Sequence, residues 1–534
     1  MVDRSRAGAL AVVLVWHGVS GHRPPPPSRA HATHAASTTG AAAVPPIFCN
    51  RAVNLGRMEA IGFDMDHTLA QYKAEPFDQL AYRGAINKLI GLGYPPQIAG
   101  FEYDITRYQR GLVIDRARGN VLKMDRHKYV KVAQHGMREM DPEERKELYD
   151  RSRPSFDPPD FTNIDTAFML VDVCLYCQLV DLKDSDAPGA LGARSYAQIY
   201  SDVRRAVDLC HCDGVIKDDV MRTPADFIDP DSMMGAMLTR IRSAGQTPFL
   251  VTNSAWEYTD AVMTYLLGGE RDGAAAFGHA DWTGFFDVII VGARKPAFLL
   301  DSNLPIFRVR QSDGSLLNLE NAEFASAASV AAVLRAGKVF QGGNWNHLHK
   351  LVGLSSVDRL LYVGDHMYSD VLRAKRSLGW RTMLVVPELD KETRVRKEHS
   401  RMREAIQDAR DELLSLEREL ADLELIVEPL VSPAPDAAVP ADAAAQRDVL
   451  GGALAAAKAT LAERVLAYHR KFHPHWGQLF KTGYQNSRFA QQVENYACLY
   501  AARASHLGFY SPRTRFHTIV DEMPHDRHER SSQP

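Results

Sequence analysis

Two aspartates, Asp64 and Asp66, stand one residue apart at the end of an apolar run in the stretch IGFDMDHTLAQYK. A buried strand gains little stability from carboxylates at its end, so this pair points to chemistry. Side chains on alternate residues of an extended strand share one face, and two carboxylates that lie so close require a cation or a retained proton. We therefore expect a paired-carboxylate site that begins at Asp64.

Three later apolar runs also end in polar side chains. These are Thr252 and Asn253 in LVTNS, Lys295 in VGARKP, and Asp365 and Asp370 in YVGDHMYSD. Each has an ordinary alternative, such as helix capping by Asn253 or Ser254 and a solvated loop lysine at position 295. Together and in this order, the motifs DxDxT, T, K and GDxxxxD resemble the signature of the haloacid dehalogenase superfamily of phosphatases.

The residue types fit the hydrolysis of a phosphate monoester. A hard divalent cation, most simply Mg²⁺, would neutralise the repulsion between the phosphate dianion and an attacking carboxylate. We expect Asp64 as nucleophile and Asp66 as general acid and base. Thr252, Asn253 and Lys295 would stabilise the phosphoryl oxygens, and Asp370 would position Lys295. The predicted metal ligands are Asp64, Asp66 and Asp365.

Strands alternate with helices around these motifs, which predicts an α/β fold with a doubly wound (Rossmann-like) parallel sheet. The fold would be of the haloacid dehalogenase type, with an inserted α+β cap and a helical C-terminal extension. The expected parts are a disordered leader or targeting segment (1–48), the catalytic core in two pieces (49–95 and 225–392), a cap or substrate domain (96–224), and a helical hairpin with the C-terminal extension (393–534).

Within these parts we expect helices at 75–95, 161–182 and 196–212 and a hairpin within 111–136. Cys174 and Cys177 lie in an apolar helical run and are interpreted as core residues rather than a metal or redox pair. A heptad seam predicts a coiled-coil helix, followed by a second helix over 447–471. The seam residues are Met402, Ile406, Ala409, Leu413, Leu416, Leu420, Leu423 and Val427. The hairpin would pack on the core or on a partner subunit.

Composition limits the remaining classes. The 534 residues carry a net charge of −3, and 45% are apolar, as in multidomain globular proteins. The near-neutral charge argues against a nucleic-acid partner, and six cysteines are too few for a disulfide scaffold. No apolar run beyond the first twenty residues would span a membrane. We expect a cytoplasmic protein, or an organellar one if the acid-poor leader is a transit peptide.

Longer segments narrow the resemblance to the cytosolic purine 5′-nucleotidase family. They are GFDMDHTLAQYK, LVTNSAWEYTDAVMTYLL, RKPAF, YVGDHMYSDVLRAKRSLGWRTMLVVPEL and GQLFKTGYQNSRFAQQVENYACLYAARASHL. The resemblance implies a Mg²⁺-dependent 5′-nucleotidase that hydrolyses purine nucleoside monophosphates of the IMP and GMP type through an aspartyl-phosphate. It is compatible with a homo-oligomer, either a dimer or a tetramer.

The resemblance also implies substrate residues in the cap. Phe168 would stack on the purine, and SDVRRAVDLCHCDGVIK would supply Arg204, Asp208, His211 and Lys217. Cys212 stands where the family has a tyrosine, so one wall of the base pocket would be smaller. An amphipathic helix with solvated charges remains the alternative interpretation of 196–212.

Regulation is where the sequence departs from the family, whose members are activated by nucleotides at a separate site. Gln492 is kept, but Asp165 replaces an asparagine and Asn495 an arginine, which predicts weak activation by ATP or none. Tyr368 and Arg376 keep the character of two other effector contacts. Two alternatives stay open: a phosphatase of this fold with another phosphomonoester substrate, and a scaffold or regulatory protein without turnover.

Overall fold

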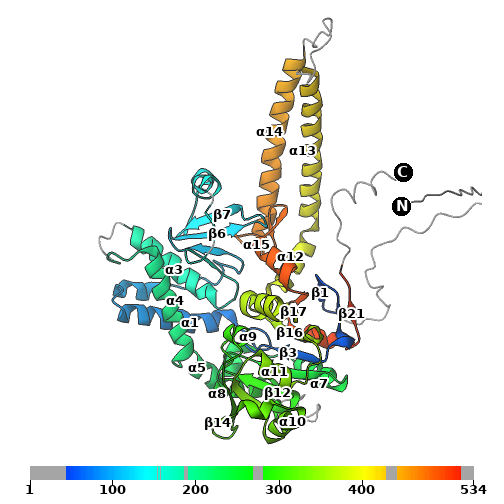
Figure 1. The fold of residues 1–534 in the computed structure, drawn as a ribbon. Helices are drawn as coiled ribbons and strands as arrows, with labels where there is room; N and C mark the ends of the chain where they lie inside the picture. Colours follow the sequence, from blue (N-terminus) through cyan, green and yellow to red (C-terminus); the bar gives the residue numbers. More distant parts are fainter. Residues whose placement is uncertain are drawn as a thin grey trace, which may run out of the picture. The chain divides into compact units, whose positions relative to one another are not determined.

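A ten-stranded mixed sheet forms the centre of the protein, in the order β1-β20-β17-β16-β3-β11-β12-β15-β13-β14 (Figure 1). The structure is a computed structural model that describes residues 44–152, 154–156, 158–185, 191–268, 281–427 and 442–518. The predicted leader, up to residue 43, lies outside the described residues. From Pro45 onward the chain forms one compact unit.

The middle of this sheet is parallel. Its strands are β3 (Ala60–Phe63), β11 (Thr247–Val251), β12 (Val288–Val291), β15 (Val339–Gly342), β16 (Leu360–Gly364), β17 (Arg381–Val385) and β20 (Leu499–Ala501). The edges are antiparallel, through β1 (Phe48–Cys49), β13 (Ile306–Val309) and β14 (Leu316–Asn318). The predicted parallel sheet is therefore correct for the centre and wrong at both edges, where β1 pairs antiparallel with β20, and β13 with β14 and β15.

Strand β3 lies at the point where the chain reverses direction across the sheet. The chain places β11, β12 and β15 on one side of β3 and then returns to place β16 and β17 on the other. Because β3 and β16 pair in parallel, from Ala60 opposite Leu360 to Phe63 opposite Val363, their carboxyl ends are adjacent. In α/β sheets ligands bind at such a switch point.

Glycine is required inside β3. A Cβ on Gly62 would lie 2.0 Å from the ring of Phe249 on β11, so only glycine lets that ring pack across the strand. All residues of β3 are buried, which explains why its sequence reads as a continuous apolar run.

A second, antiparallel sheet precedes the main helices of the predicted cap. It contains β8 (Arg138–Glu139), β7 (Val130–His135), β6 (Asn120–Met124), β5 (Val113–Asp115) and β9 (Phe161–Asn163), in that order. The helix predicted from 161 is wrong over its first residues, because β9 pairs with β5 and completes the sheet edge. Helix α3 spans only Met169–Asp184, with Cys174 and Cys177 fully buried in it.

Helix α4 (Tyr196–Cys212) agrees with its predicted bounds and begins at a capping box formed by Ser195 and Gln198. Helix α1 (Ala74–Gly91) packs against α4, and a Cβ on Gly84 would lie 2.8 Å from the Cys210 sulfur. The predicted boundary at residue 95 assigns α1 to the core, although it packs on a cap helix; the domain boundaries stay a prediction.

The C-terminal part contains α12 (Glu388–Glu398), α13 (Ser400–Val427), α14 (Ala443–Arg470) and α15 (Arg488–Tyr496). Arg464 donates to the carbonyl of Ala405 at 2.9 Å and Lys458 lies 3.5 Å from Glu417, so α13 and α14 run antiparallel as a hairpin. Seam residues Ile406 and Ala409 are buried, as expected for the inner face. A coiled coil in the strict sense, and packing on a partner, stay predictions. None of the described helices combines the length and apolar character needed to cross a membrane.

Candidate active site

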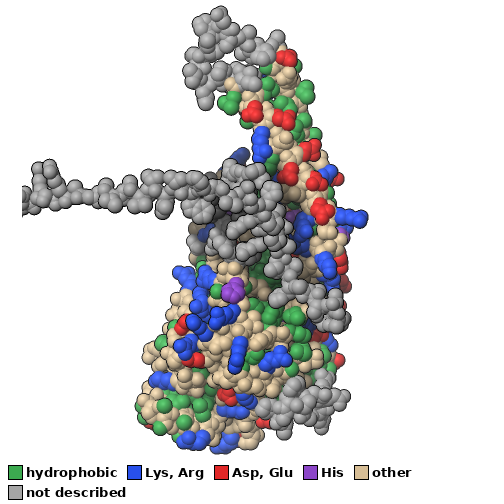
Figure 2. Space-filling view, turned by 90° about the vertical axis from the view of Figure 1, so that its right-hand side faces the viewer, with side chains coloured by type: hydrophobic (Ala, Val, Ile, Leu, Met, Phe, Trp, Pro, Cys, Tyr) green, Lys and Arg blue, Asp and Glu red, His purple; other side chains and the backbone are tan. Residues whose placement is uncertain are grey.

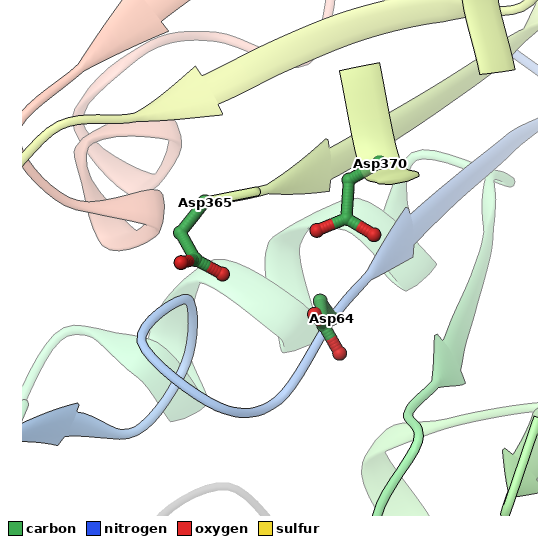
Figure 3. Close-up of side chains that lie close together, drawn as sticks. All are labelled: Asp64, Asp365 and Asp370. Carbon is green, nitrogen blue, oxygen red and sulfur yellow. The ribbon is translucent and has the colours of Figure 1, made fainter. Parts of the chain in front are cut away.

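Three buried carboxylates meet at the switch point (Figure 3). Asp64 directly follows β3, Asp365 directly follows β16, and Asp370 lies in the helical turn after Asp365. One oxygen of each carboxylate lies within 4.8 Å of the others. The strand pairing of β3 with β16 thus brings together aspartates that are about three hundred positions apart, by the general geometry of parallel sheets.

Lys295 lies between two of these carboxylates. Its Nζ atom is 2.8 Å from Asp64 Oδ2, 2.8 Å from Asp370 Oδ1 and 2.9 Å from the Tyr362 hydroxyl. Burial disfavours the ammonium, but Asp370 and Asp64 together raise the pKa of Lys295 well above its ordinary value. Gly364 permits this arrangement, since a Cβ there would lie 2.5 Å from Asp370 Cβ. Lys295 is therefore a permanent buried cation, and Asp370 holds it beside Asp64.

The carboxylates are crowded enough to favour a bound cation. Burial raises the pKa of Asp64 well above its ordinary value, Lys295 opposes this, and Asp370 and Asp365 add to it. Burial and Asp370 raise the pKa of Asp365 to about 6. A divalent ion would relieve both effects, and a set of carboxylate oxygens suits a hard cation such as Mg²⁺. The donor set therefore fits a divalent metal site.

Asp66 lies beyond the end of β3 and has hydrogen-bond partners of its own. Strand β3 ends at Phe63, and the chain then turns through His67, whose φ is 54°. The Asp66 carboxylate accepts from the Tyr72 hydroxyl at 2.6 Å and from Ser254 Oγ at 2.8 Å. Asp66 is not among the three carboxylates that lie within 4.8 Å of one another, and its role as a metal ligand stays a prediction.

Asn253 and Thr252 organise the second motif. Helix α8 (Trp256–Leu267) begins at Ala255 without a side-chain cap, so capping does not explain Asn253. Instead, Asn253 Oδ1 accepts from the Lys295 backbone N–H at 2.6 Å, and its Nδ2 donates to the Lys295 carbonyl at 3.1 Å. Thr252 Oγ1 accepts from the Ser254 N–H at 3.0 Å and lies 3.5 Å from Asp66 Oδ2. Asn253 thus fixes the loop that carries Lys295.

An ion pair behind Asp365 was not predicted. Arg110 is 2% exposed; it contacts Glu388 through Nε at 2.7 Å and Nη2 at 2.5 Å, and donates from Nη1 to the Asp365 carbonyl at 3.2 Å. It joins the predicted cap to the loop that carries Asp365. No motif surrounds Arg110 in the sequence, so only the fold reveals this contact.

Phe168 lies in an aromatic cluster that reaches the Asp66 loop. Its ring centroid is 4.4 Å from His67 and 5.1 Å from His211, both edge-on. Burial lowers the pKa of His67 to about 3 and that of His211 to about 4, so both imidazoles are neutral at pH 7. The ammonium of Lys217 lies 5.2 Å from the Tyr258 ring. The Tyr258 hydroxyl lies 2.9 Å from that of Tyr72, the partner of Asp66.

Arg204 and Asp208, both predicted substrate residues, form an ion pair with each other. Arg204 Nη1 donates to Asp172 Oδ2 at 2.6 Å, and its other donors contact both oxygens of Asp208. Asp172 is fully buried, and burial raises its pKa to about 6 although Arg204 opposes the shift. After burial, Arg204 is the largest cause of the lowered pKa of His211, so it lies near the aromatic cluster while its guanidinium is held by two carboxylates.

A parallel sheet with crowded carboxylates and a buried lysine at its switch point defines a class, an α/β protein equipped for phosphoryl transfer. The model of the 5′ nucleotidase family matches residues 47–528, and the chain belongs to this family. The predicted family is thereby confirmed.

Two curated relatives carry matching names. The human 5′-nucleotidase domain-containing protein 2 is 29% identical over 361 residues, which is 65% of this chain and 64% of the human protein. The chain thus covers somewhat less than two thirds of that relative. A 5′-nucleotidase domain-containing protein of Dictyostelium discoideum is 25% identical over 492 residues, 90% of this chain and 74% of its own length.

Among solved structures, CbbY from Rhodobacter sphaeroides in complex with phosphate is 15% identical, with a TM-score of 0.21. The match covers 61% of this chain and 86% of the CbbY chain. At this TM-score the likeness supports no argument about fold or function.

Proposed function

We propose that the protein is a Mg²⁺-dependent 5′-nucleotidase that hydrolyses purine nucleoside monophosphates through an aspartyl-phosphate on Asp64. The observation that carries the proposal is the different surroundings of the two aspartates. Asp64 contacts a buried ammonium, whereas Asp66 accepts hydrogen bonds from two hydroxyls. Two carboxyl groups held in different environments can take different roles in catalysis.

The metal site would use the carboxylates of Asp64 and Asp365, with Asp66 as the third predicted ligand. A bound Mg²⁺ would neutralise the repulsion between the phosphate dianion and Asp64. Asp370 already accepts from Lys295 at 2.8 Å, so its role is to hold that lysine. Thr68 and Thr166 each place a hydroxyl 3.4 Å from an Asp365 oxygen and orient this carboxylate.

In the first half-reaction an Asp64 oxygen attacks phosphorus, and the bond from phosphorus to the 5′ oxygen breaks. Asp66, in its protonated form, donates a proton to that leaving oxygen. In the second half-reaction water attacks the aspartyl-phosphate, Asp66 takes its proton, and Asp64 and inorganic phosphate are released. Lys295 and Thr252 stabilise the charge on the phosphoryl oxygens. Burial and Asp66 raise the pKa of Tyr72 well above its ordinary value, so this phenol remains a donor to Asp66.

The aromatic cluster supports a nucleotide substrate. Phe168 contacts both His67 and His211, and His67 directly follows Asp66. A purine on Phe168 would gain stacking energy without meeting a charged imidazole, because both histidines are neutral at pH 7. The Lys217 ammonium lies over the Tyr258 ring, and the Tyr258 hydroxyl contacts the Tyr72 hydroxyl, which donates to Asp66. From this position Lys217 can bind the ribose or the phosphate of the substrate.

A second candidate, a phosphatase acting on another phosphomonoester, is favoured by Arg204. Its donors are held by Asp172 and Asp208, so it offers less to a base edge than the resemblance implies. This candidate uses the same catalytic groups and differs only in the cap.

A phosphate-release screen separates the candidates. We would compare IMP, GMP, AMP, pyrimidine 5′-monophosphates, 3′-monophosphates and sugar phosphates with Mg²⁺ present, using the Asp64→Asn protein as the blank. Fastest turnover of IMP or GMP supports the proposal. Faster turnover of a sugar phosphate supports the second candidate, and no release from any substrate in Mg²⁺ or Mn²⁺ would favour the scaffold alternative.

A further inference from the structure

A basic groove lies at the opposite end of the central sheet from the carboxylates. It encloses about 1150 Å³ and is lined by residues at the amino ends of the parallel strands. Glu59 precedes β3, Gln246 precedes β11, Arg359 precedes β16, and Arg381 begins β17. Asp64 and Asp365 follow the carboxyl ends of β3 and β16, so the groove is separate from the active site.

Arginine dominates the lining of this groove. Its charged residues are Arg57, Arg359, Arg381, Arg513 and Arg515, opposed by Glu59 and Asp358. Glu59 already accepts from Arg359 at 2.7 Å and from Ser355. Arg57, Arg513 and Arg515 have no side-chain hydrogen bond or ion pair within the described parts of the chain. The groove therefore offers guanidinium groups whose donors have no partner among the residues that the structure describes.

Figure 2 faces the side of the molecule where α7 (Met234–Ser243) and β21 (Arg515–Phe516) lie in Figure 1. Lys and Arg side chains gather over the lower half of this face, and few acidic side chains lie between them. The chain as a whole has a net charge of −3, so this concentration of positive charge is local. A local positive field attracts anions and increases their rate of association.

One residue of the groove lining, Gln246, also has a buried acceptor without a partner among the described residues. Gln246 is 6% exposed and its Nε2 donates to the Leu55 carbonyl at 2.6 Å, while its Oε1 has no partner among the described residues. A buried acceptor left unpaired costs free energy. A ligand hydroxyl, or a water held beside the ligand, would satisfy it.

We propose that this groove binds a small polyphosphate, either inorganic or as the phosphate chain of a nucleotide. Guanidinium groups bind phosphate oxygens in pairs, and several free ones in one groove suit several linked phosphates. The volume is slightly above the range of small-molecule sites, which suits a flexible chain in an open groove. Single-stranded nucleic acid is disfavoured, because no exposed Phe, Tyr or Trp lines the groove within the described residues: Phe516 is only 8% exposed, which leaves His517 as the exposed ring of the lining.

The test is a binding measurement by calorimetry on the full chain with sodium tripolyphosphate and with ATP, in EDTA. Without a divalent ion the carboxylates of the active site repel a polyanion, so the groove is the site observed. We expect saturable binding of the tripolyphosphate that weakens as salt rises. The double variant Arg513→Ala/Arg515→Ala should weaken it about tenfold or more, the effect of losing one strong charged contact.

The matched control is Arg83→Ala, another exposed arginine, on α1, which should change the affinity less than about twofold, as expected for a site remote from the groove. Tighter binding of ATP than of tripolyphosphate identifies a nucleotide as the source, and equal binding identifies the phosphate chain alone. The proposal is overturned if wild type does not bind tripolyphosphate, if Arg83→Ala weakens binding as much as the double variant, or if a single-stranded RNA of similar charge binds more tightly.

Discussion

The carboxyl edge of the central sheet and the aromatic cluster of the cap place their polar residues by different means. At the sheet edge, Asp64 and Asp365 follow paired strands, and Lys295 is fixed by Asn253 through two backbone hydrogen bonds. In the cap, Phe168 and Arg204 come from α3 and α4, whose relative position depends on side-chain packing. Backbone pairing fixes the spacing of neighbouring strands, whereas the angle between packed helices varies more widely.

The difference implies that chemistry and substrate choice are separable. Changes at the sheet edge should remove turnover on every substrate. Changes in the cap should act mainly on KM, and only for substrates that carry a base. We therefore consider variants at the sheet edge first and variants in the cap after them.

The largest effect should follow Asp64→Asn. The change removes the nucleophile, so kcat should fall on the order of 10⁴-fold or more on every substrate. It also removes a buried carboxyl whose pKa is raised by burial, so the melting temperature should not fall. Phosphate release and thermal melting check both outcomes.

Asp66→Asn is the companion variant for this experiment. It should lose far more activity on IMP than on p-nitrophenyl phosphate, whose leaving group departs without a proton. Equal losses on both substrates would contradict the role of Asp66 as the acid, and near wild-type turnover of Asp64→Asn would contradict the mechanism.

Lys295→Met should remove both activity and stability. The buried carboxylates of Asp64 and Asp370 would lose their cation, which costs about 3–5 kcal/mol when one partner of a buried pair is removed. The pKa of Asp64 is already raised and would rise further without Lys295. The protonated Asp64 carboxyl therefore favours the folded state at low pH, and this contribution to stability is lost as pH rises. Melting temperatures in EDTA should therefore differ more from wild type at pH 8 than at pH 5. Lys350→Met, at an exposed lysine, is the control, and a deficit independent of pH would argue against this account.

Asp365→Ala should abolish stabilisation by Mg²⁺. A ligand present at 100 times its Kd stabilises the folded state by about 2.7 kcal/mol, so millimolar Mg²⁺ should raise the melting temperature of wild type. Without Asp365 the donor set loses a carboxylate, and both this shift and the activity should require much more Mg²⁺. Asp226→Ala, at an exposed aspartate, should behave as wild type. An unchanged Mg²⁺ titration in Asp365→Ala would place the metal elsewhere.

Phe168→Ala should raise KM for IMP about tenfold, through lost stacking, and leave p-nitrophenyl phosphate nearly unchanged. Arg204→Ala needs a paired design, because it leaves the buried Asp172 carboxylate uncompensated. The pKa of Asp172 is raised to about 6, so its contribution is present below the unfolded value near 4 and lost as pH rises through about 6. The destabilisation should thus be larger at pH 8 than at pH 5.

Adding Asp172→Asn to Arg204→Ala should restore stability, and KM for IMP in this double variant then reports the role of Arg204 in binding. Recovery of KM together with stability would mean that Arg204 supports only the fold. If Phe168→Ala lowers activity equally on IMP and on p-nitrophenyl phosphate, the result would favour the second candidate, a phosphatase that acts on another phosphomonoester.

The sheet edge was predictable from the sequence because each motif ends a buried apolar run, and parallel strands carry their ends to one edge. The turn at His67 was not, since it depends on where β3 stops, and the Asp66 carboxylate finds its hydrogen-bond partners on either side of it in the fold. Arg110 and Tyr72 were also missed, because their roles arise from tertiary contacts with Asp365 and Asp66 that no local pattern encodes. The antiparallel edge strands are too short to give a clear period.

The smallest effect concerns regulation, where we expect ATP to change IMP hydrolysis less than about twofold. Asp165 stands where the resembled family has an asparagine; it is buried, and Nδ1 of His366 lies 3.9 Å from its Oδ1. Burial raises the pKa of Asp165, yet a carboxyl beside a polyphosphate gives no cationic cradle. Asn495 adds no charge either.

The assay uses sub-saturating IMP with millimolar ATP at constant free Mg²⁺, in wild type and in Arg513→Ala/Arg515→Ala, so that any effect of the basic groove is recognised. Strong activation that persists in the double variant and disappears on changing Gln492 or Arg376 would show that the effector site is intact and that the substitutions at 165 and 495 do not weaken it.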